Sequence, residues 1–348
     1  MSGPRVSDDY RFRGIDTVFL ENEHLRVEVL AGKGADVTEI RDKRTDVNVL
    51  FEAPHQWYGA DHPEVGVSDR DFAFLDRYPG GWQDALPMAG GGADAGGAPF
   101  AQHGESSIVP WSATITEDSA ERAAVRFEVD LSRYPFRVER ELSLAAGEPR
   151  LHVAETVTNR GEVELPYSWL QHIALGEPLV APGARLAADC DRVLVDPDHD
   201  PPTRRLPKGA TFEWPVCDPG DVPDDADVAP DEPIDLREFP PREARVHDIA
   251  ALADFSSGAY AVSNPDLDLR VDVSFDADLY EYVWYWGAFG GFEAAPFFGR
   301  NYNVGLEPCT SRPVAGLDAA VENGTANRLD AGESVSTELD LAVGPVDE

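Results

Sequence analysis

Hydrophobic and polar residues alternate with a period of two over long parts of this chain, and this pattern is the strongest constraint on its fold. The alternation fills residues 17–51, 112–162 and 258–286. In the second segment, Val125 and Phe127 each precede a charged residue. Such alternation places one face of a strand against a core. No segment holds an apolar stripe with a period of 3.6 over three turns, so the sequence predicts an all-β sandwich or barrel.

Two regions interrupt this pattern. Residues 80–100 are so rich in glycine that we predict a loop, and residues 196–248 are crowded with proline and aspartate. An aperiodic stretch as long as the second is unusual inside a compact domain unless it covers something. Because the alternation is alike on both sides of it, we predict one domain over residues 1–348 with a long loop-rich excursion at about 196–248.

The charge balance is strongly acidic. There are 65 Asp and Glu residues against 29 Lys and Arg, a net charge of −36, and the only lysines are Lys33, Lys43 and Lys208. The carboxylates are spread along the whole chain and aromatic residues are plentiful, which excludes an acidic disordered tail. We expect a halophilic protein kept soluble in concentrated salt, which screens its self-repulsion. Partners that present phosphates, such as nucleic acid or an anionic membrane, require clustered Lys and Arg and are not expected.

The cysteines and the lengths of the apolar runs indicate the cellular compartment. Cys190, Cys217 and Cys309 are widely spaced, odd in number and without a C-x-x-C pair, so neither a disulfide framework nor a zinc knuckle is expected. The first residues contain no apolar signal segment, and no run approaches the roughly 18 apolar residues of a membrane span. These features predict a soluble, cytoplasmic protein.

Three polar residues stand in apolar or aromatic surroundings and are the first candidates for a site. They are Glu307 after an apolar run, His172 in an aromatic strand, and His103 just after the glycine-rich stretch. Taken alone, Glu307 also fits a solvated strand end, and His172 also fits a satisfied core histidine. A metal site formed by His103, Glu105 and His172 is a further alternative.

The order of several short motifs resembles that of the aldose 1-epimerase (galactose mutarotase-like) superfamily over nearly the whole chain. The matching segments are LENE (20–23), GADVTEI (34–40), HG (103–104), QHIALG (171–176), ADCDRVLVD (188–196) with LPKG (206–209), and GLEP (305–308). The proline and aromatic residue that usually follow the second histidine are replaced by Ile173 and Ala174. The resemblance implies a large antiparallel β-sandwich with a site in a cleft on its concave face.

The resemblance also implies roles for individual residues. The family's general base and general acid correspond to Glu307 and His172, and its assisting hydroxyl ligand corresponds to His103. Asp248 and Arg77 are loose counterparts of its substrate-binding aspartate and arginine.

After Arg77 the family pattern is replaced by GGWQ, residues 80–83. We interpret Trp82 and Gln83 as this subgroup's own means of holding the ligand. Trp286 is a second candidate in the cleft, because the C–H faces of sugars stack on aromatic rings.

The implied reaction is the interconversion of sugar anomers by acid/base catalysis at C1. A carboxylate and an imidazole suit it because their ordinary pKa values, about 4.3 and 6.5, leave one ionised and the other able to carry a proton near neutrality. The expected substrate is a small sugar, either a free aldose or a related sugar acid or deoxy sugar, and neither a metal nor an organic cofactor is required.

Three other functions remain open. A hexose-phosphate 1-epimerase on the same fold would need guanidinium groups near the cleft, for which Arg300 and Arg312 are candidates. A non-catalytic carbohydrate-binding protein would keep the pocket without the chemistry. A glycosidase would need two suitably spaced carboxylates, and only Glu307 stands out. The sequence does not define the sugar, the pathway or the oligomeric state.

Overall fold

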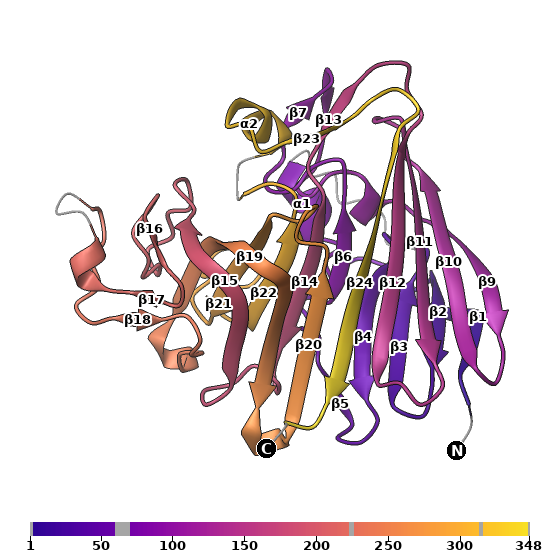
Figure 1. Cartoon of the computed structure of the whole chain (residues 1–348), viewed down its shortest axis with the longest axis horizontal. Helices are drawn as coiled ribbons and strands as arrows, with labels where there is room; N and C mark the ends of the chain where they lie inside the picture. The colour runs from indigo at the N-terminus through magenta and orange to yellow at the C-terminus, as the bar shows by residue number, and fades with distance from the viewer. Residues whose placement is uncertain (1–2, 60–69, 223–225, 313–315, 347–348) are drawn as a thin grey trace.

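The computed structural model describes residues 3–59, 70–222, 226–312 and 316–346, and within them eighteen strands form one antiparallel sheet (Figure 1). The sheet bends round and nearly closes on itself. Two of its edge strands meet where the Val6 amide of one donates a hydrogen bond to Asp118 Oδ1 of the other, at 3.3 Å. The predicted all-β class and antiparallel sandwich are confirmed.

The sheet has two halves that share one strand. The first half runs in the order β1 (Arg5–Phe12), β2 (Ile15–Glu21), β3 (Leu25–Leu30), β4 (Asp36–Asp42), β6 (Trp82–Ala85), β14 (Leu170–Gly176), β22 (Tyr302–Cys309), β21 (Tyr282–Phe289) and β19 (Val246–Asn264). The second half runs β9 (Ser112–Asp118), β10 (Arg122–Asp130), β11 (Phe136–Ala145), β12 (Arg150–Asn159), β24 (Ser334–Gly344), β20 (Leu269–Phe275) and again β19.

Further elements complete the described chain. They are β5 (Val47–Asn48), β7 (Asp94–Ala95), β8 (Ala98–Pro99), β13 (Leu165–Tyr167), β15 (Arg185–Val195), β16 (Thr211–Glu213), β17 (Val216–Cys217), β18 (Ile234–Asp235), β23 (Asn327–Leu329), the helices α1 (Arg70–Leu75) and α2 (Leu317–Glu322), and 3₁₀ turns at Ser106–Ile108, Pro219–Asp221, Arg242–Ala244 and Pro265–Leu267. Among them β5, β15 and β16 belong to the same large sheet, and β15 pairs with β19.

The long strand β19 forms the corner between the two halves. Its first part, Val246–Ala253, pairs with β21, and its last part, Ala259–Asn264, pairs with β20. Between them Asp254 adopts a positive φ of 61° and the register with β15 shifts by a bulge. A bend of this kind lets one strand pass from one sheet layer to the next.

The alternation seen in the sequence places the core between the two halves. On β11, Val138 and Leu142 are fully buried and lie opposite Val157 and Val153 of β12. Each such side chain contributes about 1.5–3 kcal/mol by leaving water. The charged residues between them face outward, with Arg140 as the exception.

The glycine-rich stretch 80–100 is not a loop throughout, and here the prediction was wrong. Its first part forms β6, which lies in the middle of the sheet between β4 and β14 and is buried at every position. A strand buried on both faces shows no alternation. Gly80 and Gly81 have positive φ, and a Cβ would lie 2.0 Å from the Phe51 carbonyl oxygen and 2.2 Å from that of Val37 respectively.

The predicted excursion at 196–248 corresponds to the segment that carries β16, β17 and β18, which projects beside β15 (Figure 1). Its first part contacts the loop that follows β21, where Thr203 Oγ1 donates a hydrogen bond to the Gly291 carbonyl at 2.8 Å. That this segment belongs to a single domain stays a prediction.

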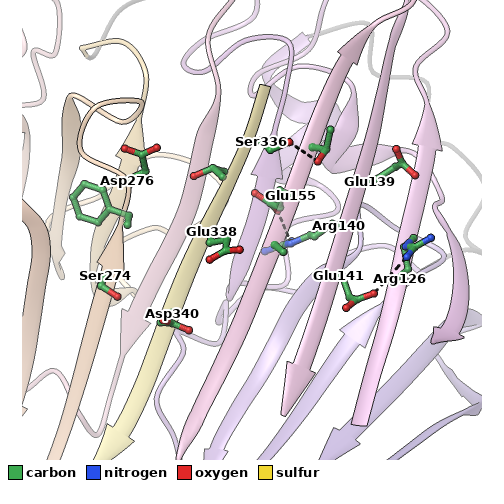
Figure 2. Close-up of a pocket in the computed structure, with 14 residues that line it drawn as sticks. Arg126, Glu139, Arg140, Glu141, Glu155, Ser274, Asp276, Ser336, Glu338 and Asp340 are labelled. Carbon is green, nitrogen blue, oxygen red and sulfur yellow. Dashed lines mark hydrogen bonds and ion pairs between the residues drawn. The ribbon is translucent and has the colours of Figure 1, made fainter. Parts of the chain in front are cut away.

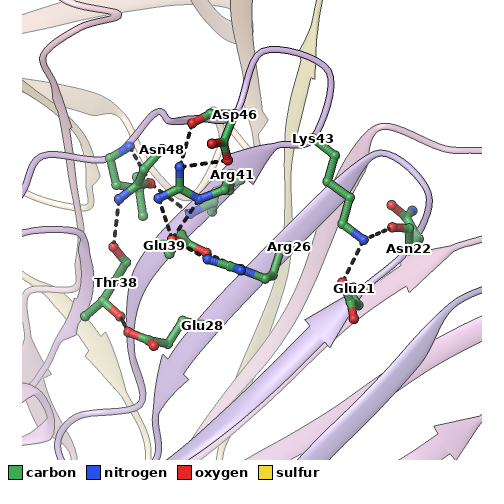
Figure 3. A network of polar contacts seen from close by, with 12 residues as sticks. Glu21, Asn22, Arg26, Glu28, Thr38, Glu39, Arg41, Lys43, Asp46 and Asn48 are labelled. Atoms are coloured by element: carbon green, nitrogen blue, oxygen red, sulfur yellow. Dashed lines mark hydrogen bonds and ion pairs between the residues drawn. The ribbon is translucent and has the colours of Figure 1, made fainter. Parts of the chain in front are cut away.

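The outer surface of the first half carries ion pairs between neighbouring strands (Figure 3). Glu39 accepts from Arg26 Nε at 2.6 Å and from Arg41 Nη2 at 2.8 Å, and Lys43 Nζ lies 2.7 Å from Glu21. Exposed pairs contribute only about 0–1 kcal/mol each. Adaptation to salt therefore stays a prediction, and among the described residues no helix is long and apolar enough to cross a membrane.

A buried polar cluster lies behind the middle of the sheet. Arg140 Nε is 2.7 Å from Glu155 Oε1 with both side chains fully buried, and the guanidinium lies over the Trp82 ring at 4.8 Å. Gln171 Nε2 donates to Glu155 Oε2 at 2.7 Å, and Trp82 Nε1 donates to Gln171 Oε1 at 2.8 Å. The cluster joins β6, β11, β12 and β14.

Replacing Arg140 by leucine should therefore lower the free energy of unfolding by about 3–5 kcal/mol, because it leaves the Glu155 carboxylate buried without a counter-ion. Urea denaturation measures this loss. The double variant Arg140→Leu/Glu155→Leu should recover most of it, and equal losses in the single and double variants would contradict the assignment of the cost to an unpaired charge.

Candidate functional site

A cavity of about 510 Å³ lies against the outer face of β14, β19, β21 and β22 and contains the predicted catalytic residues. Helix α1, the turn after the glycine-rich stretch and the segment that follows β15 form its other walls. The lining residues with polar side chains are Tyr78, Gln102, His103, His172, Asp196, Asp198, His199, His247, Trp284, Tyr285, Trp286 and Glu307.

A larger hollow, of about 980 Å³, lies elsewhere and has a different character (Figure 2). It is an open trough over β10, β11, β12, β24 and β20, bordered by surface acids such as Glu139, Glu338 and Asp340. None of the predicted site residues lines it. A row of carboxylates on a chain of this charge is a solvated face, so we place the candidate site in the smaller cavity.

Strand pairing brings His172 and Glu307 face to face. Leu170 of β14 lies opposite Cys309 of β22, and Ala174 lies opposite Gly305, so His172 and Glu307 occupy facing positions. The distance from His172 Nε2 to Glu307 Oε1 is 3.6 Å, slightly too long for a hydrogen bond. Among the described residues neither Glu307 Oε1 nor His172 Nδ1 has a hydrogen-bond partner. A buried, unpartnered Glu307 Oε1 beside the His172 ring is suited to a hydroxylated ligand.

Gly305 provides the space for the Glu307 carboxylate. A Cβ at this position would lie 2.3 Å from Glu307 Oε1 and 3.1 Å from Trp286 Cβ. The sequence Gly-Leu-Glu on β22 therefore sets the direction of the acid. Its glycine removes a side chain from the face on which the carboxylate lies.

His103 approaches the pair from a strained turn. Its φ is +59°, a conformation that non-glycine residues rarely adopt, and Gly104 follows with φ +75°. The His103 ring packs edge-on against His172 with the centroids 4.9 Å apart, and Phe74 of α1 contacts both rings, at 4.7 and 5.8 Å. The turn thus places the predicted hydroxyl ligand beside the predicted acid.

Aromatic rings form the rest of the wall around His172. Tyr78 and Trp286 lie 5.5 and 5.9 Å from its ring, between centroids, and Phe297 packs on both of them. The hydroxyl of Tyr78 is buried and has no partner among the described residues. Such a surface combines flat apolar faces with a few polar groups, as ligand sites commonly do.

Burial shifts the protonation of these groups in opposite directions. It lowers the pKa of His172 to about 4 and lowers the pKa of His103 well below its usual value, whereas it raises the pKa of Glu307 well above its usual value. The desolvated pair thus favours a neutral imidazole and a protonated carboxyl. No lysine or arginine is among the described residues that line the cavity. Burial therefore favours the neutral form of each group, in a cavity whose described lining has no fixed positive charge.

The structure brings together four of the eight predicted site residues: His103, His172, Trp286 and Glu307 all line the cavity. Trp82 and Gln83 do not line it. They are fully buried, Trp82 in the polar cluster around Arg140, and Gln83 with its Nε2 donating to the Gly80 carbonyl at 2.7 Å. The GGWQ segment thus contributes packing rather than a ligand-facing surface.

Asp248 and Arg77 also lie outside the lining. Asp248 Oδ1 accepts from the Arg205 backbone amide at 2.6 Å and its Oδ2 from Arg205 Nε at 2.9 Å, with a longer bond of 3.3 Å from the Leu206 amide. Its carboxylate is satisfied by the segment that follows β15, so its position supports anchoring of that segment rather than direct contact with a ligand.

Several lining residues were not predicted from the sequence. The most distinctive are His199, which begins the proline- and aspartate-rich excursion, and His247, which precedes the predicted Asp248. Phe74, Tyr78 and Phe297 belong to the same group. The available signal was the prediction that the excursion covers something, but no pattern indicated which of its residues face inward.

Residues proposed for two alternative chemistries, metal binding and phosphate binding, have other partners in the structure. Glu105, proposed as a metal ligand, accepts instead from the backbone amides of Ser132 and Arg133, at 2.8 and 3.0 Å, and no group of three or more metal-ligating side chains is found among the described residues. Neither Arg300 nor Arg312, the two arginines proposed for a phosphate, lines the cavity, and Arg300 donates to the carbonyls of Pro54, Pro296 and Phe297.

The fold is that of galactose mutarotase-like proteins. A candidate aldose 1-epimerase from Klebsiella pneumoniae superposes with a TM-score of 0.72 at 14% identity, over 98% of this chain and 83% of the other. A galactose mutarotase-like protein from Clostridium acetobutylicum gives 0.65 at 14% identity, over 99% and 100%. A candidate aldose 1-epimerase from Escherichia coli K12 gives 0.58 at 17% identity, over 93% and 97%. At these identities the likeness establishes the fold.

Within this fold the chain belongs to the family described as Domain of unknown function (DUF4432), whose profile matches residues 12–215. His103 and His172 lie inside the matched range, and Glu307 lies beyond it. No curated protein matches the sequence.

The close contact at Gly305 gives a direct test of the site geometry. Gly305→Ala should displace the Glu307 carboxylate and lower the free energy of unfolding by about 1–3 kcal/mol, because the added methyl overlaps a buried group. Gly344→Ala is the matched control, since no atom lies within 4 Å of a Cβ there and the residue is also in a strand. Chemical denaturation compares the two, and equal stabilities would show that the carboxylate does not lie over Gly305.

Proposed function

We propose that this protein is an aldose 1-epimerase that interconverts the anomers of an uncharged sugar. The observation that carries the proposal is the facing pair of His172 and Glu307, 3.6 Å apart in a cavity of about 510 Å³. The shared fold supports it, and the roles rest on the geometry of this chain.

The pair supplies what anomer exchange requires. One group removes the proton from the C1 hydroxyl while the other gives a proton to the ring oxygen, the bond between C1 and the ring oxygen breaks, and an open-chain aldehyde forms. Rotation about the bond between C1 and C2 presents the other face, and the ring recloses with the proton transfers reversed. The sugar keeps its composition, and the pair begins and ends with one proton.

The shifted pKa values determine where that proton rests. With the pKa of Glu307 raised and that of His172 lowered, a proton carried by the pair lies on Glu307 rather than on His172. With Glu307 as base and His172 as acid, ring opening starts from the ionised pair, a Glu307 carboxylate and a His172 imidazolium, and leaves both groups neutral. Ring closure starts from this neutral pair and restores the ionised one. Because the two sites are coupled, the protonation of the pair as a whole governs the rate, rather than that of either residue.

The charge of the cavity favours a neutral substrate over a phosphorylated one. Its described lining contains the carboxylates of Asp196, Asp198 and Glu307 and no cationic side chain. A phosphate group binds best to Arg, Lys or clustered amides. The phosphorylated alternative therefore lacks its anchor among the residues described, and a non-catalytic binding role would leave the facing acid and base without a purpose.

The first experiment follows the optical rotation of freshly dissolved α-anomers of neutral hexoses and pentoses in high salt. Wild type should accelerate the change for at least one sugar, and Glu307→Gln and His172→Asn should each reduce kcat by about 10²- to 10⁴-fold, the usual contribution of a positioned acid or base.

Glu338→Gln, in the trough of Figure 2, is the matched control and should leave the rate unchanged. If wild type is no faster than buffer for every neutral sugar although a sugar binds, the protein is a carbohydrate-binding protein instead.

The pH dependence provides a second test. The pKa of His172 is lowered to about 4, so as pH falls the pair becomes doubly protonated only near that pH. The value of kcat/KM should therefore stay constant through the ordinary histidine pKa of about 6.5 and decline near pH 4. The alkaline decline should lie above the ordinary glutamate range, because the pKa of Glu307 is raised.

Circular dichroism at each pH controls for unfolding. An acid limb centred near pH 6.5 would mean that His172 is solvated and that the pair does not hold its proton as described.

A further inference from the structure

Trp286 separates two histidine pairs within the cavity. On one side its ring lies 5.9 Å from that of His172, between centroids, and His172 contacts His103. On the other side its Nε1 donates to His247 Nε2 at 3.2 Å, and the rings of His247 and His199 meet edge-on with centroids 4.5 Å apart. The first pair belongs to the proposed reaction, and the second pair has no role in it.

The hydrogen bond from Trp286 fixes the tautomer of His247. Because Nε2 accepts from the indole, the proton of the neutral ring lies on Nδ1. This Nδ1 is buried, and no group among the described residues accepts its proton. The ring is only 5% exposed and stacks flat on Phe292 with the centroids 4.4 Å apart. A fixed, buried and unpartnered donor on a cavity wall calls for an acceptor from a ligand.

His199 supplies the complementary group. Its Nε2 lies 3.3 Å from the His247 carbonyl oxygen and so carries the proton, which leaves Nδ1 as an acceptor. The segment that carries it is anchored on both sides, by Asp196 Oδ1 accepting from the His199 amide at 3.1 Å and by the bonds of Arg205 to Asp248. A donor on one ring and an acceptor on the other match the two hydrogen-bonding functions of one hydroxyl group.

The charges at this end oppose an anion. Asp196 and Asp198 line it, and the described lining has no lysine or arginine to balance a phosphate or carboxylate. Burial also lowers the pKa of His247 to about 3, so the ring stays neutral at physiological pH. The cavity also has room beyond one ring, since even a generous share of about 30 Å³ per heavy atom, that of a water molecule in the liquid, gives a hexose at most about 360 Å³.

We propose that His199 and His247 form a second subsite that binds a hydroxyl group remote from the reacting carbon and thereby selects uncharged sugars. This inference rests on the proposed function for the class of ligand, a sugar. It does not require that the protein catalyses anomer exchange. The subsite hydrogen-bonds a neutral hydroxyl through His247 Nδ1–H and His199 Nδ1 and excludes a phosphate or carboxylate in the same place.

The test separates binding from turnover. Protein with ¹³C- and ¹⁵N-labelled histidine is titrated in high salt with D-glucose, D-galactose, D-mannose, D-xylose and maltose, and with glucose 6-phosphate and glucuronate. At least one neutral sugar should shift the His247 and His199 ring signals, with the two anions bound at least tenfold more weakly. His247→Phe should weaken the binding of that sugar about tenfold, the order expected for a lost hydrogen bond to a neutral group.

Two further variants keep the result interpretable. His247→Gln keeps an acceptor for Trp286 and a donor for the ligand, so it should restore affinity to within about threefold of wild type. His152→Gln, on β12 and paired with Asp340, is a control that should change nothing. If His247→Phe merely misfolds the wall, then His247→Gln and the tryptophan fluorescence spectrum of the protein reveal it, and His199→Phe gives an independent loss.

The outcomes distinguish this inference from the proposed function. Sugar-induced shifts of His247 without any acceleration of anomer exchange would support the subsite and remove the epimerase. Exchange with unchanged KM in His247→Phe and His199→Phe, tight binding of glucose 6-phosphate, or no response to any neutral sugar would each overturn the subsite.

Discussion

The site depends on one constraint, a carboxyl group and an imidazole that face each other across paired strands after both have lost their water. In water the two groups would ionise separately, because their ordinary pKa values lie on opposite sides of about pH 5. In the cavity the cost of burying charge moves the pKa of Glu307 up and that of His172 down, so both groups favour their neutral forms. The same desolvation that disfavours the ions strengthens any hydrogen bond that a bound sugar makes to them. Gly305, the strained turn at His103 and the aromatic wall all serve to maintain this arrangement.

Strand β14 joins the cavity to the interior of the sheet. Successive side chains on a strand point to opposite faces, so His172 faces the cavity while its neighbour Gln171 faces the buried cluster of Arg140 and Glu155. Gln171 is held by Trp82 and Glu155, and this fixes the backbone on which His172 is carried. The ion pair between Arg140 and Glu155 thus matters mainly because it fixes the register of β14 and the direction in which His172 points. A buried pair adds little net stability over apolar packing, but it penalises any shift that leaves one partner alone.

The fold was predictable from residue alternation, and half of the predicted site residues line the cavity. The sequence failed where burial on two faces removes the alternation, as in β6, and where a side chain has a partner that no spacing indicates. Trp82 was interpreted as a ligand platform, yet an indole N–H that finds a buried amide oxygen is satisfied within the core. Asp248 was placed near the substrate by analogy, but it bonds backbone amides of a segment more than forty positions earlier in the chain. Glu307, His172 and His103 could be singled out in the sequence because their motifs are short and local, whereas the partners of Asp248 are set by tertiary structure alone.

The excursion after β15 shows why this part of the site escaped prediction. Its proline and aspartate content indicates a loop, and loops are defined by what they pack against rather than by their own period. Here that segment returns to the sheet, where Asp248 and the Gly291 carbonyl bind it, and this return brings His199 beside His247. An aspartate that was expected to contact the ligand instead anchors the segment that carries a histidine of the cavity wall. If proteins sharing this sheet differ in the excursion, they differ in the wall opposite Trp286, while the facing pair on β14 and β22 stays with the sheet itself.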